Sequence, residues 1–282
     1  MFVQSPSLNL VKAESDINLI SCYKDLIAIS TDNEVSIVGE NHVYSVKHPL
    51  QTNSLLFYDQ NTIITGHEKQ LMVYDIRSNI KQVYQNFAED IVYRLTKVPN
   101  NQIICACSNA ENTLSTIDLR NPLVPTIQYS SHSDFITKLF PLKNYFYSAD
   151  EGGNIYKFAY DDDTIMNRVK FNRSQQLIDM SYSYQKDYFL ILLENNIIKQ
   201  TETIVFDDII NNPDDTPYHG LLFCQNDTKT VFYNNSEVIF CDEACDDYGE
   251  YIKISDHDCV AASFKNGCLF TDGPLLLFNQ LD

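Results

Sequence analysis

Residues 145–158 read YFYSADEGGNIYKF, and this stretch decides the fold class of the chain. Aromatic and β-branched residues fill its two ends, Tyr145 to Tyr147 and Ile155 to Phe158, and such residues favour strands. Between them lies Gly152-Gly153, and glycine accepts the positive φ angles of a two-residue hairpin turn. No long segment with the periodicity of a capped amphipathic helix occurs elsewhere, so we expect an almost entirely β protein.

The same unit of apolar run, polar turn and second run recurs along the chain. The first residues of seven such turns are Asp32, Glu68, Glu111, Gly152, Glu194, Asn235 and Asp272. By subtraction, successive turns lie 36, 43, 41, 42, 41 and 37 residues apart. A period near 40 is typical of β-propellers, whose four-stranded units stand radially and bury their apolar faces against one another. We therefore predict a seven-bladed β-propeller of four-stranded blades.

The two ends of the chain are predicted to meet in one blade. The last unit has room for only three strands, which we place at Cys259 to Phe264, Gly267 to Thr271 and Leu275 to Phe278. The N-terminal segment Phe2 to Lys12 can supply the fourth strand and close the ring. No linker rich in Pro, Gly or Ser divides the chain, so residues 1–282 are expected to form a single domain.

The ends of the third strands carry a short repeated pattern. It reads Tyr74-Asp75-Ile76-Arg77 in unit two, Ile117-Asp118-Leu119-Arg120 in unit three and Cys241-Asp242 in unit six. Over nearly its whole length the chain thereby resembles the WD-repeat propeller family. The family's Trp is absent, however, and the residues in its place are Tyr74, Ile117, Phe158, Cys241 and Phe278. The turns predict seven blades. Because the family's sequence signatures are incomplete, six or eight blades remain alternatives.

The resemblance also implies a polar network inside a blade, made of a buried His, Ser or Thr, Asp and Trp. Unit four retains His132 and Ser148, but we find neither the turn Asp nor the Trp there. A polar network with missing members is worse than none. We therefore expect the blades to be packed mostly by apolar contacts.

Negative charge dominates the chain and is uneven. The sequence has 20 Lys and Arg against 38 Asp and Glu, a net charge of −18. Residues 1–173 have 15 basic and 19 acidic residues, net −4, whereas residues 174–282 have 5 and 19, net −14. Nucleic-acid binding depends on neutralising phosphates with Lys and Arg, so we expect no direct contact with DNA or RNA.

The family topology implies that many of these acids surround one face, here called the acidic face. Its turn residues are Asp32, Glu68, Glu111, Glu151, Glu194 and Asp272. Acids in the loops that lead into the blades are Glu89, Asp90, Asp134, Asp214, Asp215, Asp256 and Asp258. Such a rim can steer and hold a basic partner, for example a histone-like tail or a ribosomal protein segment. The alternative is that these acids are solvated and keep the protein soluble.

Three clusters contain chemically interesting residue types, but none has the arrangement that its chemistry needs. Cys241, Cys245, His257 and Cys259 are zinc-ligand types at irregular spacing, so we predict no metal site and no cofactor. Asp161-Asp162-Asp163 lacks the alternating ligands, Gly and final Glu of a calcium loop and is expected to be an exposed turn. His132-Ser133-Asp134 is predicted to be a structural loop, because adjacent residues cannot form a catalytic relay.

Arg77 and Arg120 follow the third strands of units two and three, on the face opposite the acidic face. Salt-bridged turn residues are the favoured interpretation, and a second contact surface is the alternative.

The whole pattern predicts a non-catalytic protein–protein interaction scaffold, acting as a subunit or assembly factor of a larger complex. No phosphate-binding glycine loop, metal-ligand helix or nucleophile elbow is present. The apolar runs are too short to span a bilayer, and the first ten residues lack signal-peptide features, so we expect a cytoplasmic or nuclear protein. The alternative is a propeller hydrolase whose carboxylates bind a divalent metal ion at the central mouth.

Overall fold

The structure is a computed structural model. It describes residues 8–32, 34–39, 43–47, 50–78, 80–85, 87–88, 90–98, 102–108, 112–121, 124–170, 176–183, 187–193, 196–200, 205–211, 218–224, 229–242, 248–254, 259–264, 267–272 and 274–280. All regular secondary structure in this part of the chain is β-strand, which confirms the predicted all-β class. None of these residues belongs to a helix long and apolar enough to cross a membrane.

The described strands form seven four-stranded sheets in which neighbouring strands are antiparallel. Contacts group the chain into two compact units. Unit 1 is Met1–Asp32 with Gln175–Asp282, and unit 2 is Asn33–Ser174. The sheet that follows the N-terminal strand consists of β2 (Leu19–Tyr23), β3 (Leu26–Ser30), β4 (Glu34–Val38) and β5 (Val43–Lys47).

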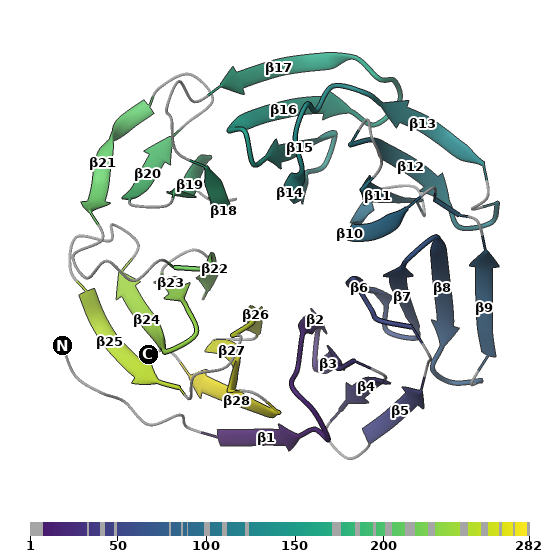
Figure 1. The fold of residues 1–282 in the computed structure, drawn as a ribbon, viewed down its shortest axis with the longest axis horizontal. Helices are drawn as coiled ribbons and strands as arrows, with labels where there is room; N and C mark the ends of the chain where they lie inside the picture. Colours follow the sequence, from purple (N-terminus) through teal and green to yellow (C-terminus); the bar gives the residue numbers. More distant parts are fainter. Residues whose placement is uncertain are drawn as a thin grey trace. The chain divides into compact units, whose positions relative to one another are not determined.

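Unit 2 contains three complete sheets in chain order. The first is β6 (Ser54–Asp59), β7 (Thr62–His67), β8 (Gln70–Asp75) and β9 (Ile80–Gln85). The second is β10 (Ile91–Val98), β11 (Gln102–Ser108), β12 (Leu114–Asp118) and β13 (Pro125–Tyr129). The third is β14 (Ile136–Pro141), β15 (Tyr145–Asp150), β16 (Asn154–Ala159) and β17 (Ile165–Lys170). Strand β10 contacts both β6 and β14, so the first strands of these sheets lie side by side, with β9, β13 and β17 on the outer side (Figure 1).

Unit 1 repeats this arrangement. One sheet is β18 (Leu177–Ser183), β19 (Tyr188–Leu193), β20 (Asn196–Gln200) and β21 (Val205–Asn211). The next is β22 (Gly220–Cys224), β23 (Lys229–Tyr233), β24 (Glu237–Asp242) and β25 (Tyr248–Lys253). The last contains β26 (Ala261–Phe264), β27 (Gly267–Asp272) and β28 (Leu275–Gln280). Contacts join β18 to β22, β22 to β26 and β26 to β2, again through the first strands.

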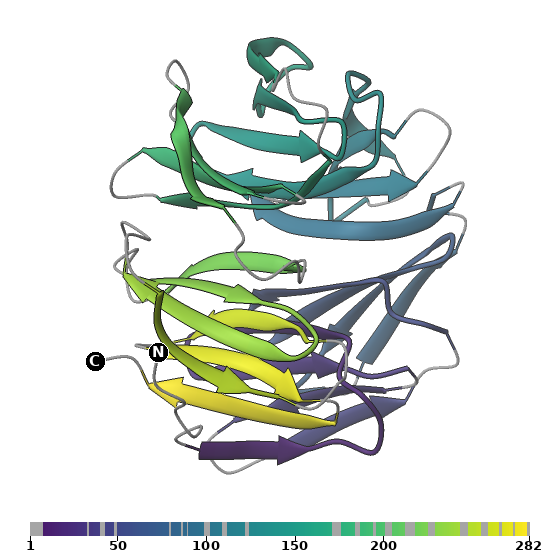
Figure 2. The same cartoon turned by 60° about the vertical axis from the view of Figure 1, so that its left-hand side comes forward.

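The N-terminal strand β1 (Leu8–Lys12) completes the last sheet, as the sequence predicts. It pairs antiparallel with β28, with Leu8 opposite Phe278 and Lys12 opposite Leu275. A backbone hydrogen bond of 2.8 Å from the Ala13 N–H to the Pro274 carbonyl extends the pairing. Figure 2 shows β1, in purple, along the outer edge of the yellow sheet. The two ends of the chain are thus joined by strand pairing.

The predicted hairpin turns between second and third strands are present in unit 2. Their left-handed positions are Lys69 (φ 56°), Asn112 (φ 46°) and Gly153 (φ 79°). The second strands β7 and β15 are buried at every position except the first, and in unit 1 every residue of β19 is buried. A strand buried at every position has covered side chains on both faces of its sheet. The sheets are therefore packed between neighbours, as blades are.

Aromatic side chains fill the space between neighbouring sheets. The ring of Tyr129, from β13, lies 5.2 Å from that of Phe146 and 4.9 Å from that of Phe158, both in the next sheet. All three side chains are fully buried. Burying an aromatic side chain of this kind stabilises the fold by about 2 kcal/mol.

Hydrogen bonds between first strands add direction to this packing. The Ser54 hydroxyl donates to the Val92 carbonyl (2.8 Å), and the Tyr93 hydroxyl accepts the Ile136 N–H (3.1 Å). In unit 1 the buried Asp179 carboxylate accepts the Leu221 N–H (2.9 Å). We call these contacts the cross-sheet hydrogen bonds. Each of these bonds joins a side chain of one sheet to a backbone group of the next sheet. The bonds therefore fix how the neighbouring first strands are aligned along their length.

Gly66→Ala is expected to lower the free energy of unfolding by about 2 kcal/mol. An added Cβ would lie 2.3 Å from Ser54 Oγ and 2.6 Å from the Val92 carbonyl oxygen, within a cross-sheet hydrogen bond. Urea unfolding followed by tyrosine fluorescence measures the loss. Gly152→Ala is the matched control, since its nearest contact is a side-chain oxygen of Asp134 at 3.3 Å. Equal effects of the two substitutions would contradict the packing described.

Candidate functional site

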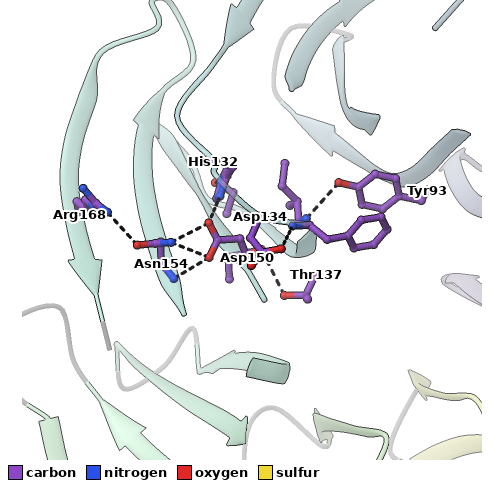
Figure 3. Close-up of polar contacts among 11 residues, drawn as sticks. Tyr93, His132, Asp134, Thr137, Asp150, Asn154 and Arg168 are labelled. Atoms are coloured by element: carbon purple, nitrogen blue, oxygen red, sulfur yellow. Dashed lines mark hydrogen bonds and ion pairs between the residues drawn. The ribbon is translucent and has the colours of Figure 1, made fainter. Parts of the chain in front are cut away.

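A buried polar network links the loop before β14 to strands β15, β16 and β17 (Figure 3). His132 Nδ1 lies 3.0 Å from Asp150 Oδ2, and His132 Nε2 lies 2.6 Å from Ser148 Oγ. The Asn154 backbone N–H (2.8 Å) and side-chain amide (2.9 and 3.0 Å) donate to the same carboxylate. Arg168 then donates to Asn154 Oδ1 at 3.0 Å. The network thus joins four successive segments of one sheet and the loop that leads into it.

The proton positions in this network follow from its carboxylate. An ionised carboxylate only accepts hydrogen bonds, so His132 Nδ1 carries a proton and the Ser148 hydroxyl can donate to Nε2. Burial would raise the pKa of Asp150, but the hydrogen bonds from His132 and Asn154 outweigh it and lower that pKa. The side chains of His132 and Asp150 are fully shielded from solvent. Because these two side chains do not contact solvent, we interpret the network as structural.

The sequence-based view that this unit lacks the family's Asp is wrong. Asp150 fills that role from the end of strand β15, one residue before the turn Glu151-Gly152-Gly153. The absent Trp is replaced by aromatic contacts, with the His132 ring 4.7 Å from Tyr156. An acid two residues after Ser148 on a strand of alternating faces was the signal that could have revealed it.

The sheet β6–β9 has a different version of the network. Thr65 Oγ1 lies 2.8 Å from His67 Nε2, and His67 Nδ1 lies 2.8 Å from the Gln51 carbonyl oxygen. His67 is the last residue of the second strand, β7, as Asp150 is of β15. The loop before β6 supplies the acceptor, which is the backbone carbonyl of Gln51. A carbonyl accepts only, so His67 Nδ1 carries the proton. Neither Thr65 nor His67 is exposed.

Two of the acids predicted for the acidic face lie next to the His132 network in the chain. Asp134 and Glu151 flank the network on its surface side, with Asp134 Oδ1 accepting the Phe135 N–H (2.9 Å). The Glu151 N–H donates to the Phe135 carbonyl (2.9 Å), which joins the turn to the loop before β14. Asp134 is exposed and Glu151 is half-buried. The two acids are thus held at the same end of one sheet.

Glu68 and Asp90 occupy the corresponding end of the preceding sheets. Glu68 bridges to Ile91, and the Lys69 N–H donates to the Asp90 carbonyl at 2.9 Å. Glu68 is exposed and Asp90 is half-buried. In an antiparallel sheet the start of the first strand and the turn between the second and third strands share one end. The structure therefore brings these four predicted acids to equivalent ends of adjacent sheets in unit 2.

The other predicted acids are distributed differently. In unit 1, Asp32 is exposed and accepts a hydrogen bond from the Asn18 amide (2.9 Å), and Asp272 ends strand β27 and is half-buried. Seven predicted acids lie outside the described residues: Glu89, Glu111, Glu194, Asp214, Asp215, Asp256 and Asp258.

Arg77 and Arg120 are salt-bridged turn residues, as predicted. Their guanidinium groups lie 3.1 Å from Asp75 and 2.5 Å from Asp118. These hydrogen bonds lower the pKa of Asp75 and of Asp118 to about 2. Each Arg also donates its own backbone N–H to the same Asp, so the pair closes its turn locally.

Two of the four candidate metal ligands lie in the part of the chain that the structure describes. Cys241 and Cys259 are buried, and burial raises the pKa of the Cys259 thiol to about 12. Cys245 and His257 lie outside the described residues. Within the part of the chain that the structure describes, no three His, Cys, Asp or Glu residues are placed to hold a metal ion. Asp161, Asp162 and Asp163 are exposed, in agreement with the expected surface turn.

Asp150→Asn is expected to lower the free energy of unfolding by about 3 kcal/mol at neutral pH. A carboxamide cannot accept hydrogen bonds from His132 and Asn154 together as the carboxylate does. Since the pKa of Asp150 is lowered in the fold, its contribution is complete above the unfolded value of about 3.9 and is lost as the pH falls through the folded value. The difference from the natural chain should therefore shrink at low pH.

Urea unfolding at pH 7 and at pH 3 tests this expectation. Asp161→Asn, an exposed carboxylate of the same unit, is the control and should change little at either pH. A deficit of Asp150→Asn that is equally large at both pH values would show that its carboxylate charge does not matter.

The chain is similar to known proteins in sequence and in fold. No protein family model matches the chain. A stretch of 198 residues, 68% of the chain, is 25% identical to the nuclear pore complex protein nup43 of Dictyostelium discoideum and spans 44% of that protein's length. A chain in the crystal structure of the mitotic checkpoint complex superposes with a TM-score of 0.78 at 10% identity, covering 100% of this chain and 94% of that one. Together with the four-stranded sheets, these similarities show a β-propeller fold that resembles that of WD-repeat proteins.

Proposed function

We propose that the chain is a non-catalytic scaffold subunit of a larger protein assembly, and that this assembly is of the nuclear pore type. The observation that carries the proposal is the similarity over 198 residues to a nuclear pore complex protein. The chain spans less than half of that relative, so the proposal concerns the propeller and not the rest of the relative. The expected location is accordingly the nucleus, at the pore.

The proposed architecture is a single domain with seven blades. Its support is the set of seven four-stranded sheets, the contacts between successive first strands in each unit, and the pairing of β1 with β28. A ring of this kind presents two broad surfaces to partners, and the outermost strand of each blade is its sheet edge.

The proposed partner contact is a basic protein segment on the acidic face. Glu68, Asp90, Asp134 and Glu151 support it, because they share equivalent ends of adjacent sheets in unit 2. The net charge of −18 would add long-range attraction for such a partner. Hydrogen bonds to backbone groups fix the loops that carry these acids, so the face would be organised before a partner arrives.

Affinity purification of the tagged chain from its native source, followed by mass spectrometry, tests the assembly. We expect stoichiometric recovery with other pore-complex subunits. Recovery of the chain alone, or with partners unrelated to the nuclear pore, would overturn the proposed assembly.

Replacing Glu68 and Glu151 with Gln and Asp134 with Asn is expected to weaken binding of a Lys/Arg-rich peptide about tenfold at low salt. Three lost attractions of roughly 0.5 kcal/mol each give a loss of this size. Fluorescence anisotropy at low and high salt is the measurement, and the natural chain should bind less well in high salt.

The matched control replaces Asp161, Asp162 and Asp163 with Asn, which removes the same number of negative charges from the turn between β16 and β17, at the opposite end of the sheet. It should leave peptide binding within about twofold, since screened distant charges contribute little. Equal losses in the two triple variants would assign the attraction to net charge, and unfolding of the first variant would assign its acids a structural role.

A further inference from the structure

The outer edge of unit 2 exposes large apolar side chains. Among the described residues, the exposed ones are Val83 (40%), Val124 (60%), Ile165 (43%) and Met166 (55%). Ile165 and Met166 are neighbours at the start of β17, the last strand of its sheet (Figure 1). A further strand paired with β17 would cover these two adjacent exposed apolar residues.

Strand β17 also has a free hydrogen-bonding edge. Within the described part of the chain it pairs only with β16. An edge strand presents unpaired N–H and C=O groups, and proteins usually protect such an edge with Pro or with charged residues along it. The equivalent strand β13 begins with Pro125, and β9 carries an exposed Lys81. Strand β17 carries an exposed Arg168 farther along, but its first three residues, Ile165–Asn167, include neither Pro nor a charge. A β-bulge opposite Phe158 leaves Met166 outside the ladder with β16.

The sequence around this edge is complementary to itself. It reads Asp163-Thr164-Ile165-Met166-Asn167-Arg168. If two copies pair antiparallel about the midpoint between Ile165 and Met166, each Ile165 faces a Met166 and each Asp163 faces an Arg168. Thr164 and Asn167, both polar, form the remaining pair. Apolar pairs and opposite charges directly across two strands stabilise their pairing.

We propose that β17 is a self-association edge, at which two copies of this chain join their sheets through an antiparallel β17–β17 pair. A two-fold axis makes every favourable contact occur twice, as in other symmetric dimers. Arg168 is already positioned for this role, since it donates to Asn154 Oδ1 (3.0 Å) and lies over the Tyr156 ring at 5.3 Å. Its remaining guanidinium donors can reach an acid of the second copy. Asp163, the matching acid, is exposed.

A charge exchange between two variants tests the pairing and its register. Asp163→Arg places Arg opposite Arg in a homodimer, and Arg168→Asp places Asp opposite Asp. Each single variant should dimerise about tenfold more weakly than the natural chain. An equimolar mixture of the two should regain dimers, because each Arg then faces an Asp. Sedimentation velocity over a concentration series, with one variant fluorescently labelled, measures both effects.

A second substitution keeps the test independent of the contact between Arg168 and Asn154. Met166→Asp places a charge at the centre of the pair and should also abolish the dimer, whereas Val83→Asp on β9 is the matched exposed control and should leave it intact. Thermal unfolding of each variant confirms that it is folded. A natural chain that stays monomeric at every concentration, a dimer that Met166→Asp leaves unchanged, or folded charge variants that fail to associate when mixed would each overturn the proposal.

Discussion

The fold depends on covering both faces of each four-stranded sheet. Strand β19 is buried at every position, and Tyr129 of one sheet packs against Phe146 and Phe158 of the next. A sheet with two apolar faces cannot stand alone in water, so each one requires neighbours. Cross-sheet hydrogen bonds such as that from Ser54 to the Val92 carbonyl then fix the register between neighbouring sheets. The pairing of β1 with β28 gives the last sheet its outer strand.

Buried polar groups turn this packing into a defined surface. His132, Asp150 and Asn154 join a loop, a second strand and a third strand, with every donor directed at one carboxylate. A buried network of this kind rigidifies its surroundings when its members are satisfied. Asp134 lies two residues after His132 and Glu151 directly follows Asp150, so both acids adjoin the network. Stability and the proposed partner contact are linked through these residues.

Much of the architecture was predictable because it depends on local chemistry. The turn positions follow from residues that accept positive φ, as Gly153 and Asn112 do, and the strands follow from runs of aromatic and β-branched residues. The shortage of strands at the C-terminus predicted the role of Leu8–Lys12. The His132–Asp150 contact was missed because its partners are 18 residues apart and Asp150 ends a strand instead of occupying the turn.

The sequence by itself determined the all-β class, the period near 40 residues, the acidic charge and the location of the hairpin turns, since all of these depend on residue type and spacing. Only the tertiary structure decided which polar residues meet. It paired Asp150 with His132, gave the sheet β6–β9 a different network around His67, and placed Glu68 and Asp90 on adjoining segments. It also left Ile165 and Met166 exposed on a free edge. Contacts between distant segments depend on how the sheets pack, and packing is a property of the whole fold that no local pattern contains.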